Sequence, residues 1–307
     1  MKILDLSTLL PGPLASKLLL DIADEVIRVE NPMNIDLLKT IKPTNNGVGV
    51  AYCSLNKNKT IKYLDFRKPE DKEKLIGIIQ TCDVLIENHR PGRLDKMGLG
   101  YEDSKKYNNK LIYCSITGYG YNNRLSQYPA HDLNILALSG YLDYQNRSCP
   151  PSIPPCQIAD VLTSYNAVVQ ILKKLYKHEA GWLDVSMLDS VKNLFEIVGT
   201  TEQYTQKNIS PDEMPLWGAF PCYKLYKTKD SKYVALAAIE PQFWNDFCID
   251  NHCEDMTEQQ YSLDREVISR IEGIISAKNR DEWGTYGTAY CLTPVYSYLE
   301  YQRILTT

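Results

Sequence analysis

The first thirty residues alternate between strand and helix patterns, and this alternation constrains the fold more than any other feature of the chain. Residues 2–6 (KILDL) are a short apolar run typical of a buried strand, and residues 14–22 (LASKLLLDI) carry apolar side chains at helical spacing. Residues 25–30 (EVIRVE) then show a second strand pattern. Strands joined in this way by a helix lie parallel, because parallel strands need a crossover connection. The opening therefore predicts a parallel sheet covered by helices.

The same alternation continues to about residue 206. Strands are predicted over residues 60–66, 83–87, 111–116 and 182–186, and helices over residues 68–81, 133–142, 160–177 and 187–206. We therefore expect residues 1–205 to form a large α/β domain with a Rossmann-like parallel sheet. The chain has no GxGxxG motif after its first strand and no P-loop motif, so nothing in it indicates dinucleotide or nucleoside-triphosphate binding.

The pattern changes after a polar stretch without periodicity, residues 206–216, which we interpret as a linker. Residues 220–226 and 233–238 flank a turn and are typical of a β-hairpin. Helices are predicted at 241–249, 265–277 and 280–286, and a strand near 291–295. We expect residues 217–307 to form a smaller α+β domain.

Composition excludes several classes of function. The net charge is −4, which disfavours nucleic-acid binding because phosphate recognition needs a basic surface. No apolar run of about 18 residues exists, so no membrane-spanning helix is expected. The nine cysteines are an odd number without a CxxC pair, which favours reduced thiols in the cytoplasm. Cys248, His252 and Cys253 lack a fourth ligand at a zinc-like spacing, so no metal site is predicted.

Three polar residues precede or begin predicted helices and are candidates for chemistry. His131, in PAHDLN, comes directly before an apolar helix, where backbone N–H groups can hold an oxyanion. The alternative is that Asp132 only caps the helix and that His131 is solvated. Asp160, in QIADV, also begins a helix and is an N-cap candidate on local pattern alone. Glu240, in AAIEPQFW, taken alone is a helix-start carboxylate.

Eight separated motifs, taken in order, carry a resemblance to a known family. They are LLPGPLASKLLLDIADEVIRVENP, LNKNKTIKYLDFRKPED, DVLIENHRPGRLDKMGLGYE, LIYCSITGYG, HDLNILALSGYL, GWLDVSMLDS, AIEPQFW and LTPV. From residue 1 to about residue 300 the chain resembles the family III CoA-transferase group, also called CaiB/BaiF. Within that group it looks most like the α-methylacyl-CoA racemases.

The resemblance implies a role for each of the three candidates. His131 falls on the catalytic histidine of the racemases. Asp160 falls on an aspartate shared by the whole group, which is the second acid/base of racemases and the acyl-accepting nucleophile of transferases. Glu240 falls on a glutamate that supports the histidine from the small domain. The backbone N–H groups at the His131–Asp132 helix start, with Ala130 beside them, are placed to hold the enolate oxygen.

The resemblance also implies where CoA binds. Arg90 falls where the family meets the CoA phosphates, and Lys59 and Lys96 are further phosphate candidates. The backbone of Tyr63, Leu64, Asp65 and Phe66 would line the adenine pocket. The bulky segment 162–165 stands where the family often has glycines, which predicts a narrower acyl pocket.

The lead hypothesis is therefore a racemase or epimerase of 2-methylacyl-CoA thioesters. Removing the α-proton and returning one to the opposite face needs two acid/base groups, and a His and an Asp with pKa values near neutrality serve that role. No cofactor is implied, because the CoA moiety is part of the substrate. Two alternatives stay open: transfer of CoA between carboxylic acids through an acyl-Asp160 intermediate, and a truncated paralogue that binds acyl-CoA without turnover.

The resemblance further implies an acyl-CoA thioester as the partner and a homodimer as the assembly. Family members usually continue with a C-terminal stretch that returns to the large domain, and we expect this stretch to be missing here. Its absence bears on whether the two subunits interlock.

Overall fold

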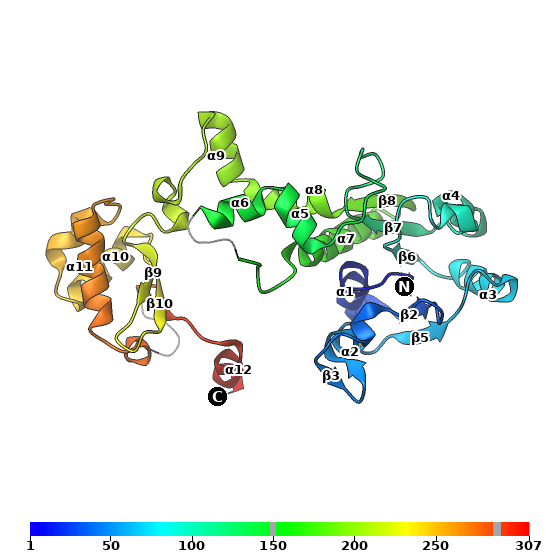
Figure 1. The fold of residues 1–307 in the computed structure, drawn as a ribbon, viewed down its shortest axis with the longest axis horizontal. Coiled ribbons are helices and arrows are strands. Elements are labelled where there is room, and N and C mark those ends of the chain that lie inside the picture. The colour runs from blue at the N-terminus through cyan, green and yellow to red at the C-terminus, as the bar shows by residue number, and fades with distance from the viewer. Residues whose placement is uncertain (148–151, 285–289, 307) are drawn as a thin grey trace. The chain divides into compact units, whose positions relative to one another are not determined.

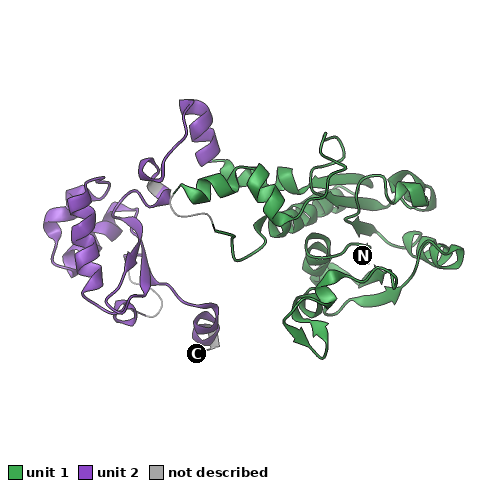
Figure 2. Cartoon of the chain, in the orientation of Figure 1, with its two compact units in different colours: residues 1–196 green, residues 197–307 purple. Residues whose placement is uncertain are grey.

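The computed structural model describes residues 1–147, 152–284 and 290–306. The chain divides into two compact units, Met1–Glu196 and Ile197–Thr307 (Figure 2). Sequence analysis placed the end of the first domain at residue 205. The difference arises because α9 (Val198–Thr205) belongs to the second unit.

The first unit contains a six-stranded sheet whose strand pairs are all parallel (Figure 1). The strand order is β5-β2-β1-β6-β7-β8. The bounds are Lys2–Asp5 for β1, Glu25–Glu30 for β2, Thr60–Tyr63 for β5, Val84–Glu87 for β6, Ile112–Thr117 for β7 and Gly181–Ser186 for β8. The predicted parallel α/β fold is confirmed.

Alternate residues of each strand point to opposite faces of this sheet, and both faces are covered by helices. Ile3 and Val26 pack on one face with α1 (Pro11–Leu18) and α7 (Ile158–Tyr176). Their chain neighbours belong to a separate cluster on the other face, with α3 (Pro69–Ile79). Since a residue period of two sends neighbouring side chains to opposite faces, near-continuous apolar strands fit a sheet buried on both sides.

Two predicted helices are interrupted in the structure. The helix predicted at 133–142 divides into α5 (Asp132–Leu138) and α6 (Tyr141–Asn146), because Gly140 has a φ of +89° that a helix interior does not allow. The long helix predicted at 187–206 is α8 (Met187–Lys192), a 3₁₀ turn and then α9. The interruption lies where the second unit begins.

The pattern analysis missed several short elements. They are α2 (Val50–Asn56), α4 (Tyr101–Tyr107), α12 (Tyr298–Thr306) and a two-stranded ribbon of β3 (Thr44–Asn45) and β4 (Val48–Gly49). The other edges of predicted elements moved by a few residues; the strand predicted at 60–66, for example, ends at Tyr63.

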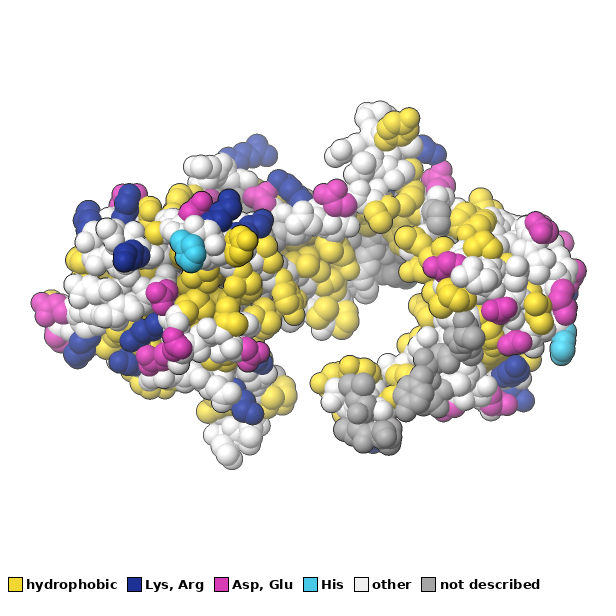
Figure 3. All heavy atoms as spheres, turned by 180° about the vertical axis from the view of Figure 1, so that it is seen from behind, with side chains coloured by type: hydrophobic (Ala, Val, Ile, Leu, Met, Phe, Trp, Pro, Cys, Tyr) yellow, Lys and Arg dark blue, Asp and Glu magenta, His cyan; other side chains and the backbone are white. Residues whose placement is uncertain are grey.

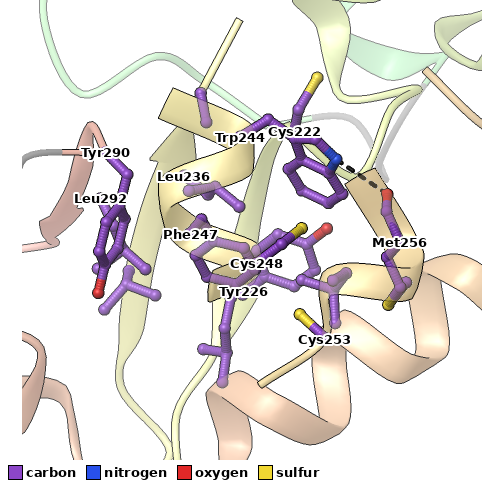
Figure 4. Packing of buried hydrophobic residues seen from close by; sticks show 14 of the residues in the cluster. Cys222, Tyr226, Leu236, Trp244, Phe247, Cys248, Cys253, Met256, Tyr290 and Leu292 are labelled. Carbon is purple, nitrogen blue, oxygen red and sulfur yellow. Dashed lines mark hydrogen bonds between the residues drawn. The ribbon is translucent and has the colours of Figure 1, made fainter. Parts of the chain in front are cut away.

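The second unit is a small α+β fold built on an antiparallel sheet in the order β11-β10-β9. The strands are β9 (Tyr223–Lys227), β10 (Tyr233–Ala237) and β11 (Leu292–Pro294), and the main helices are α10 (Pro241–Asp250) and α11 (Arg265–Ser276). Figure 4 shows their core, where the buried Trp244 indole donates a hydrogen bond to the Met256 carbonyl at 3.0 Å. Residues 280–283 form a 3₁₀ turn, and 285–289 lie outside the described residues.

Some apolar side chains stay on the surface, as the space-filling view in Figure 3 shows for both units. On α7, Tyr165, Val169, Leu172 and Tyr176 are exposed at helical spacing. In the part of the chain that the structure describes, no helix is long and apolar enough to cross a membrane.

Candidate active site

A cavity of about 240 Å³ lies in the first unit, where β1, β6 and β7 end. Its wall includes Thr8 and Leu9 after β1, residues 88–91 after β6, and Gly118 after β7. In the sheet, β2 lies beside β1 on one side and β6 lies beside β1 on the other, so the strand order reverses direction between β1 and β6. This is the topological switch point of the sheet, the place where open α/β folds bind their ligands.

His131 and Asp160 both line this cavity. His131 precedes the first residue of α5, and Asp160 lies in the first turn of α7. The two helices come from segments nearly 30 residues apart in sequence, and the structure brings their starts together through Asp132. One oxygen of the Asp132 carboxylate accepts hydrogen bonds from the Ala159 and Asp160 N–H groups, at 2.7 and 3.2 Å.

These contacts argue against the local alternative for Asp160. Asp132 caps the start of α7, a role that a capping Asp160 would otherwise fill. Within the described ranges no hydrogen bond to the Asp160 carboxyl group is found, although the residue is only partly exposed. A carboxyl group that stabilises no other part of the protein and lines a cavity is available for chemistry.

The environment of Asp160 changes its acidity. Burial, and then the negative charge of Asp132, raise the pKa of Asp160 to about 7. Burial also raises the pKa of Asp132. A carboxyl group with a pKa near 7 is present in both protonation states at neutral pH, which is what a general acid/base needs.

The predicted contact of the enolate oxygen with the start of α5 needs a correction. The His131 N–H donates a hydrogen bond to Asn134 Oδ1 at 3.0 Å, as part of a capping arrangement at the start of the helix. This N–H is therefore not available to an oxyanion. Ala130 lines the cavity, and for the Asp132 N–H no partner is found among the described residues.

Of the residues predicted to contact CoA, some line the cavity and others lie outside it. Arg90 is exposed and lines the cavity, as a phosphate-binding side chain should. Lys96 is exposed on a 3₁₀ turn, outside the cavity lining. Tyr63 ends β5 and is exposed, whereas the side chains of residues 64–66 are buried; the predicted role of their backbone stays a prediction. The segment 162–165 does not line the cavity, so it does not narrow it.

Lys59 does not fit the predicted phosphate contact. Its side chain is fully shielded from solvent, and its ammonium group donates to Asp5, to the Pro13 carbonyl and to Asn56 at 3.1, 2.8 and 3.1 Å. The three donors of the group are thus used within the protein. We assign Lys59 to the structural core.

Glu240 lies in the second unit, exposed, directly before α10. Its predicted support of His131 joins the two units and stays a prediction. Among the described residues no group of three metal-binding side chains is found. Cys248 and Cys253 are buried in the core of the second unit (Figure 4).

Sequence reasoning missed His89, which also lines the cavity. Its Nε2 atom is enclosed and has no hydrogen-bond partner in the described part of the chain. Burial, and then the positive charge of Arg93, lower the pKa of His89 to about 4. The signal that could have found His89 is its position, two residues after the end of a central parallel strand and directly before Arg90.

Comparison with known proteins identifies the family. Residues 1–304 match the model of CoA-transferase family III. The chain belongs to CoA-transferase family III. It is 36% identical over 254 residues to a CaiB/BaiF CoA-transferase family protein of Caenorhabditis elegans, covering 78% of this chain and 73% of that one.

Two human proteins that the chain is similar to are named for different reactions, one for CoA transfer and one for racemisation. Human succinyl-CoA:glutarate CoA-transferase is 33% identical over 252 residues, covering 79% of this chain and 56% of that protein. Human alpha-methylacyl-CoA racemase is 27% identical over 309 residues, covering 97% of this chain and 77% of that protein. The chain thus spans between about half and three quarters of the length of these relatives.

The fold is also that of the family. The crystal structure of a CaiB/BaiF family protein from Brucella suis matches with a TM-score of 0.81 at 22% identity, covering 99% of this chain and 85% of that chain.

Proposed function

We propose that this protein is a racemase or epimerase of 2-methylacyl-CoA thioesters that acts by two-base proton transfer. The observation that carries the proposal is that His131 and Asp160 line the same cavity, with Arg90 in its wall. Arg90 supplies a positive charge for the CoA phosphates, and the cavity takes the acyl end. The proposal extends the family assignment, which includes both racemases and transferases.

The reaction needs one group on each side of the α-carbon. One of the pair His131 and Asp160 removes the α-proton; the C–H electron pair moves into the C–C bond, and the carbonyl electron pair moves onto the thioester oxygen. The other group then gives its proton to the opposite face and the enolate collapses to the thioester. The group that began unprotonated ends with the proton of the substrate, the other ends without one, and no metal or organic cofactor takes part in this scheme.

The pKa of Asp160 suits this reaction, and the presence of His131 favours it over the alternative. A nucleophile must be ionised to attack a thioester, whereas a proton-transfer group must take up and release a proton near the working pH. A pKa of about 7 suits the second task. His131 supplies a partner that attack by Asp160 does not require.

The second candidate is transfer of CoA between carboxylic acids, with Asp160 as the nucleophile. The higher identity to the human transferase, 33% against 27% to the racemase, favours it. Asp160 would attack the thioester carbonyl and release CoA as the thiolate, forming an acyl-carboxylate anhydride. Cytoplasmic location, a homodimer and support of His131 by Glu240 stay predictions under either function.

The test is deuterium wash-in at the α-carbon of a 2-methylacyl-CoA in D₂O. We expect exchange by the wild type and a loss of about 1000-fold in His131→Ala and in Asp160→Asn, since each general acid/base contributes 10²–10⁴-fold. The matched control is His178→Asn, which changes an exposed histidine of the same unit outside the cavity. Asn tolerates the positive φ of this position.

Trapping with hydroxylamine tests the transferase alternative, because it captures an acyl group bound to Asp160. An acyl group captured on Asp160, together with CoA transfer and no α-deuterium, would replace the racemase by the transferase. Unchanged exchange in His131→Ala would remove His131 from the mechanism.

A further inference from the structure

The proposed reaction places negative charge on the thioester oxygen, and that oxygen needs hydrogen-bond donors. Of the two N–H groups predicted at the start of α5, that of His131 is used by Asn134. The Asn88 amide, which also lines the cavity, donates to the Thr8 carbonyl at 2.7 Å. Among the described residues the Asp132 N–H has no partner and stays available to this oxygen, so a side chain of the cavity wall would act as a second donor beside it.

His89 is held in this wall by contacts on several sides. Its backbone N–H donates to Glu87 Oε2 at 2.7 Å, and its imidazole ring meets the Phe66 ring edge to face, with the ring centres 6.5 Å apart. The ring also borders a second cavity of about 30 Å³ that Arg93 shares. A side chain confined in this way is already oriented before a substrate arrives, which is how donors to a developing charge act most strongly.

The hydrogen bonds of the imidazole are incomplete. Nε2 is covered by protein atoms and has no hydrogen-bond partner among the described residues. Nδ1 has no partner among those residues either, but it is not among the covered atoms. Buried polar atoms without a partner are rare and call for an explanation. A ligand that reaches the ring meets Nδ1, because protein atoms cover Nε2.

The ring is neutral at physiological pH. Burial, and then Arg93, hold the pKa of His89 at about 4. A neutral imidazole has one N–H donor and one acceptor nitrogen. With the proton on Nδ1, the enclosed Nε2 carries only a lone pair, and the positive charge of Arg93 favours this tautomer. The ring then has no buried N–H group without a hydrogen-bond acceptor.

We propose that His89 is a catalytic residue that donates a hydrogen bond from neutral Nδ1–H to the thioester oxygen of the substrate and stabilises the enolate. The inference rests on the proposed function. His89 keeps its proton throughout: the α-proton passes to His131 or Asp160, the electron pair reaches the oxygen, and the imidazole contributes only the hydrogen bond. Neutral imidazole suits this task, because it donates without neutralising the oxyanion by full proton transfer.

The experiment compares wild type, His89→Phe and His89→Gln on two compounds. The first is a 2-methylacyl-CoA, followed by deuterium wash-in for kcat and KM. The second is its thioether analogue, in which CH₂ replaces the carbonyl, measured by Kd. The analogue keeps the CoA and acyl contacts and lacks only the oxygen that His89 is proposed to meet.

We expect His89→Phe to lower kcat for exchange by about 100-fold, the usual effect of losing one oxyanion donor, and to change the Kd of the thioether less than twofold. His89→Gln should recover part of kcat, because its amide is also a neutral donor. The control His178→Asn should match wild type in both measurements.

Two results would overturn the inference. The first is wild-type exchange by His89→Phe; the second is a loss of thioether affinity as large as the loss of rate, which indicates a role in shaping the cavity. Absence of exchange in the wild type instead overturns the proposed function and this inference together, so the two failures are distinguishable.

Discussion

Two groups of titratable residues in the first unit differ in whether ion pairs hold them. The first, here called the ionic cluster, consists of Asp5, Arg28, Glu30, Asp36 and Lys59, all buried. The second consists of the cavity residues Asp160, His131 and His89. In the cluster every carboxylate has a cationic partner, whereas among the described residues no cation pairs with the carboxylate of Asp160.

Ion pairing lowers the pKa of the carboxyl group of Asp5, and the absence of such a partner leaves the pKa of Asp160 raised. Burial alone would raise the pKa of Asp5, but Lys59 and Arg28 overcome it and hold the pKa at about 2. Burial without such a partner raises the pKa of Asp160 to about 7. The same residue type is therefore structural in one place and suited to proton transfer in the other.

The ionic cluster also supports the cavity. The Arg28 Nη2 atom lies 2.7 Å from Asp36 Oδ2, and the same oxygen accepts a hydrogen bond from the Leu9 N–H at 3.1 Å. Leu9 has a φ of +64°, an unfavourable conformation for a leucine, and it lines the cavity. The ion pair of Arg28 and Asp36 thus helps to hold Leu9, a residue of the cavity wall, in place.

The largest expected effect comes from breaking the cluster. Arg28→Met removes the cation that pairs with Asp36 and one of the two cations at Asp5 and at Glu30, and should lower the free energy of unfolding by about 4 kcal/mol. Lys74→Met, which breaks an exposed pair with Asp71, should change it by less than about 1 kcal/mol. Urea denaturation of both variants measures the difference, and equal stabilities would contradict the contrast drawn above.

Asp160→Asn should act in the opposite direction on stability. An acid whose pKa is higher in the folded than in the unfolded protein loses stability as the pH rises from about 4 to about 7. Removing it should stabilise the protein at pH 8 by on the order of 3 kcal/mol, and the gain should vanish towards pH 4. A variant less stable than wild type at pH 8 would show that the carboxylate has a stabilising partner.

The acid limb of the stability curve tests the cluster itself. Asp5 has a folded pKa of about 2, below its unfolded value, so its contribution is complete above about pH 4 and is lost as the pH falls towards 2. We expect a loss of about 2 kcal/mol from this group. The stability difference between wild type and Asp5→Asn should shrink over this range, and a constant difference would argue against the pairing.

The smallest effect separates two predicted phosphate ligands. Arg90→Ala should weaken CoA binding by about tenfold, the effect of losing a charge-assisted hydrogen bond, and leave unfolding unchanged. Lys59→Met should destabilise the protein and leave the Kd of CoA unchanged, because its ammonium group binds within the core. Isothermal titration with CoA checks both, and equal losses of affinity would return Lys59 to the binding site.

Sequence alone predicted what depends on local pattern. Short, mostly apolar runs that alternate with helical patterns along the chain located all six strands of the parallel sheet. His131 and Asp160 were found through the order of family motifs, since a local pattern equally allows a helix cap. The structure adds the observation that favours chemistry: Asp132 caps α7, and Asp160 lines the cavity.

What the sequence could not show depends on contacts between distant segments. The partner that buries Lys59 is Asp5, 54 residues away, so the lysine resembled a surface cation. For His89 only its position after a central strand is visible in the sequence; its enclosure, with Phe66 and Arg93 around the ring, is not. The helix predicted at 187–206 ended early because a new unit begins there.

The most direct test of the account is to incubate the wild-type protein in D₂O with a single enantiomer of a 2-methylacyl-CoA and a second carboxylic acid. The account predicts that both enantiomers form, each with deuterium at the α-carbon, while CoA stays on its original acyl group. Retention of configuration without deuterium, together with CoA appearing on the second acid, would contradict it.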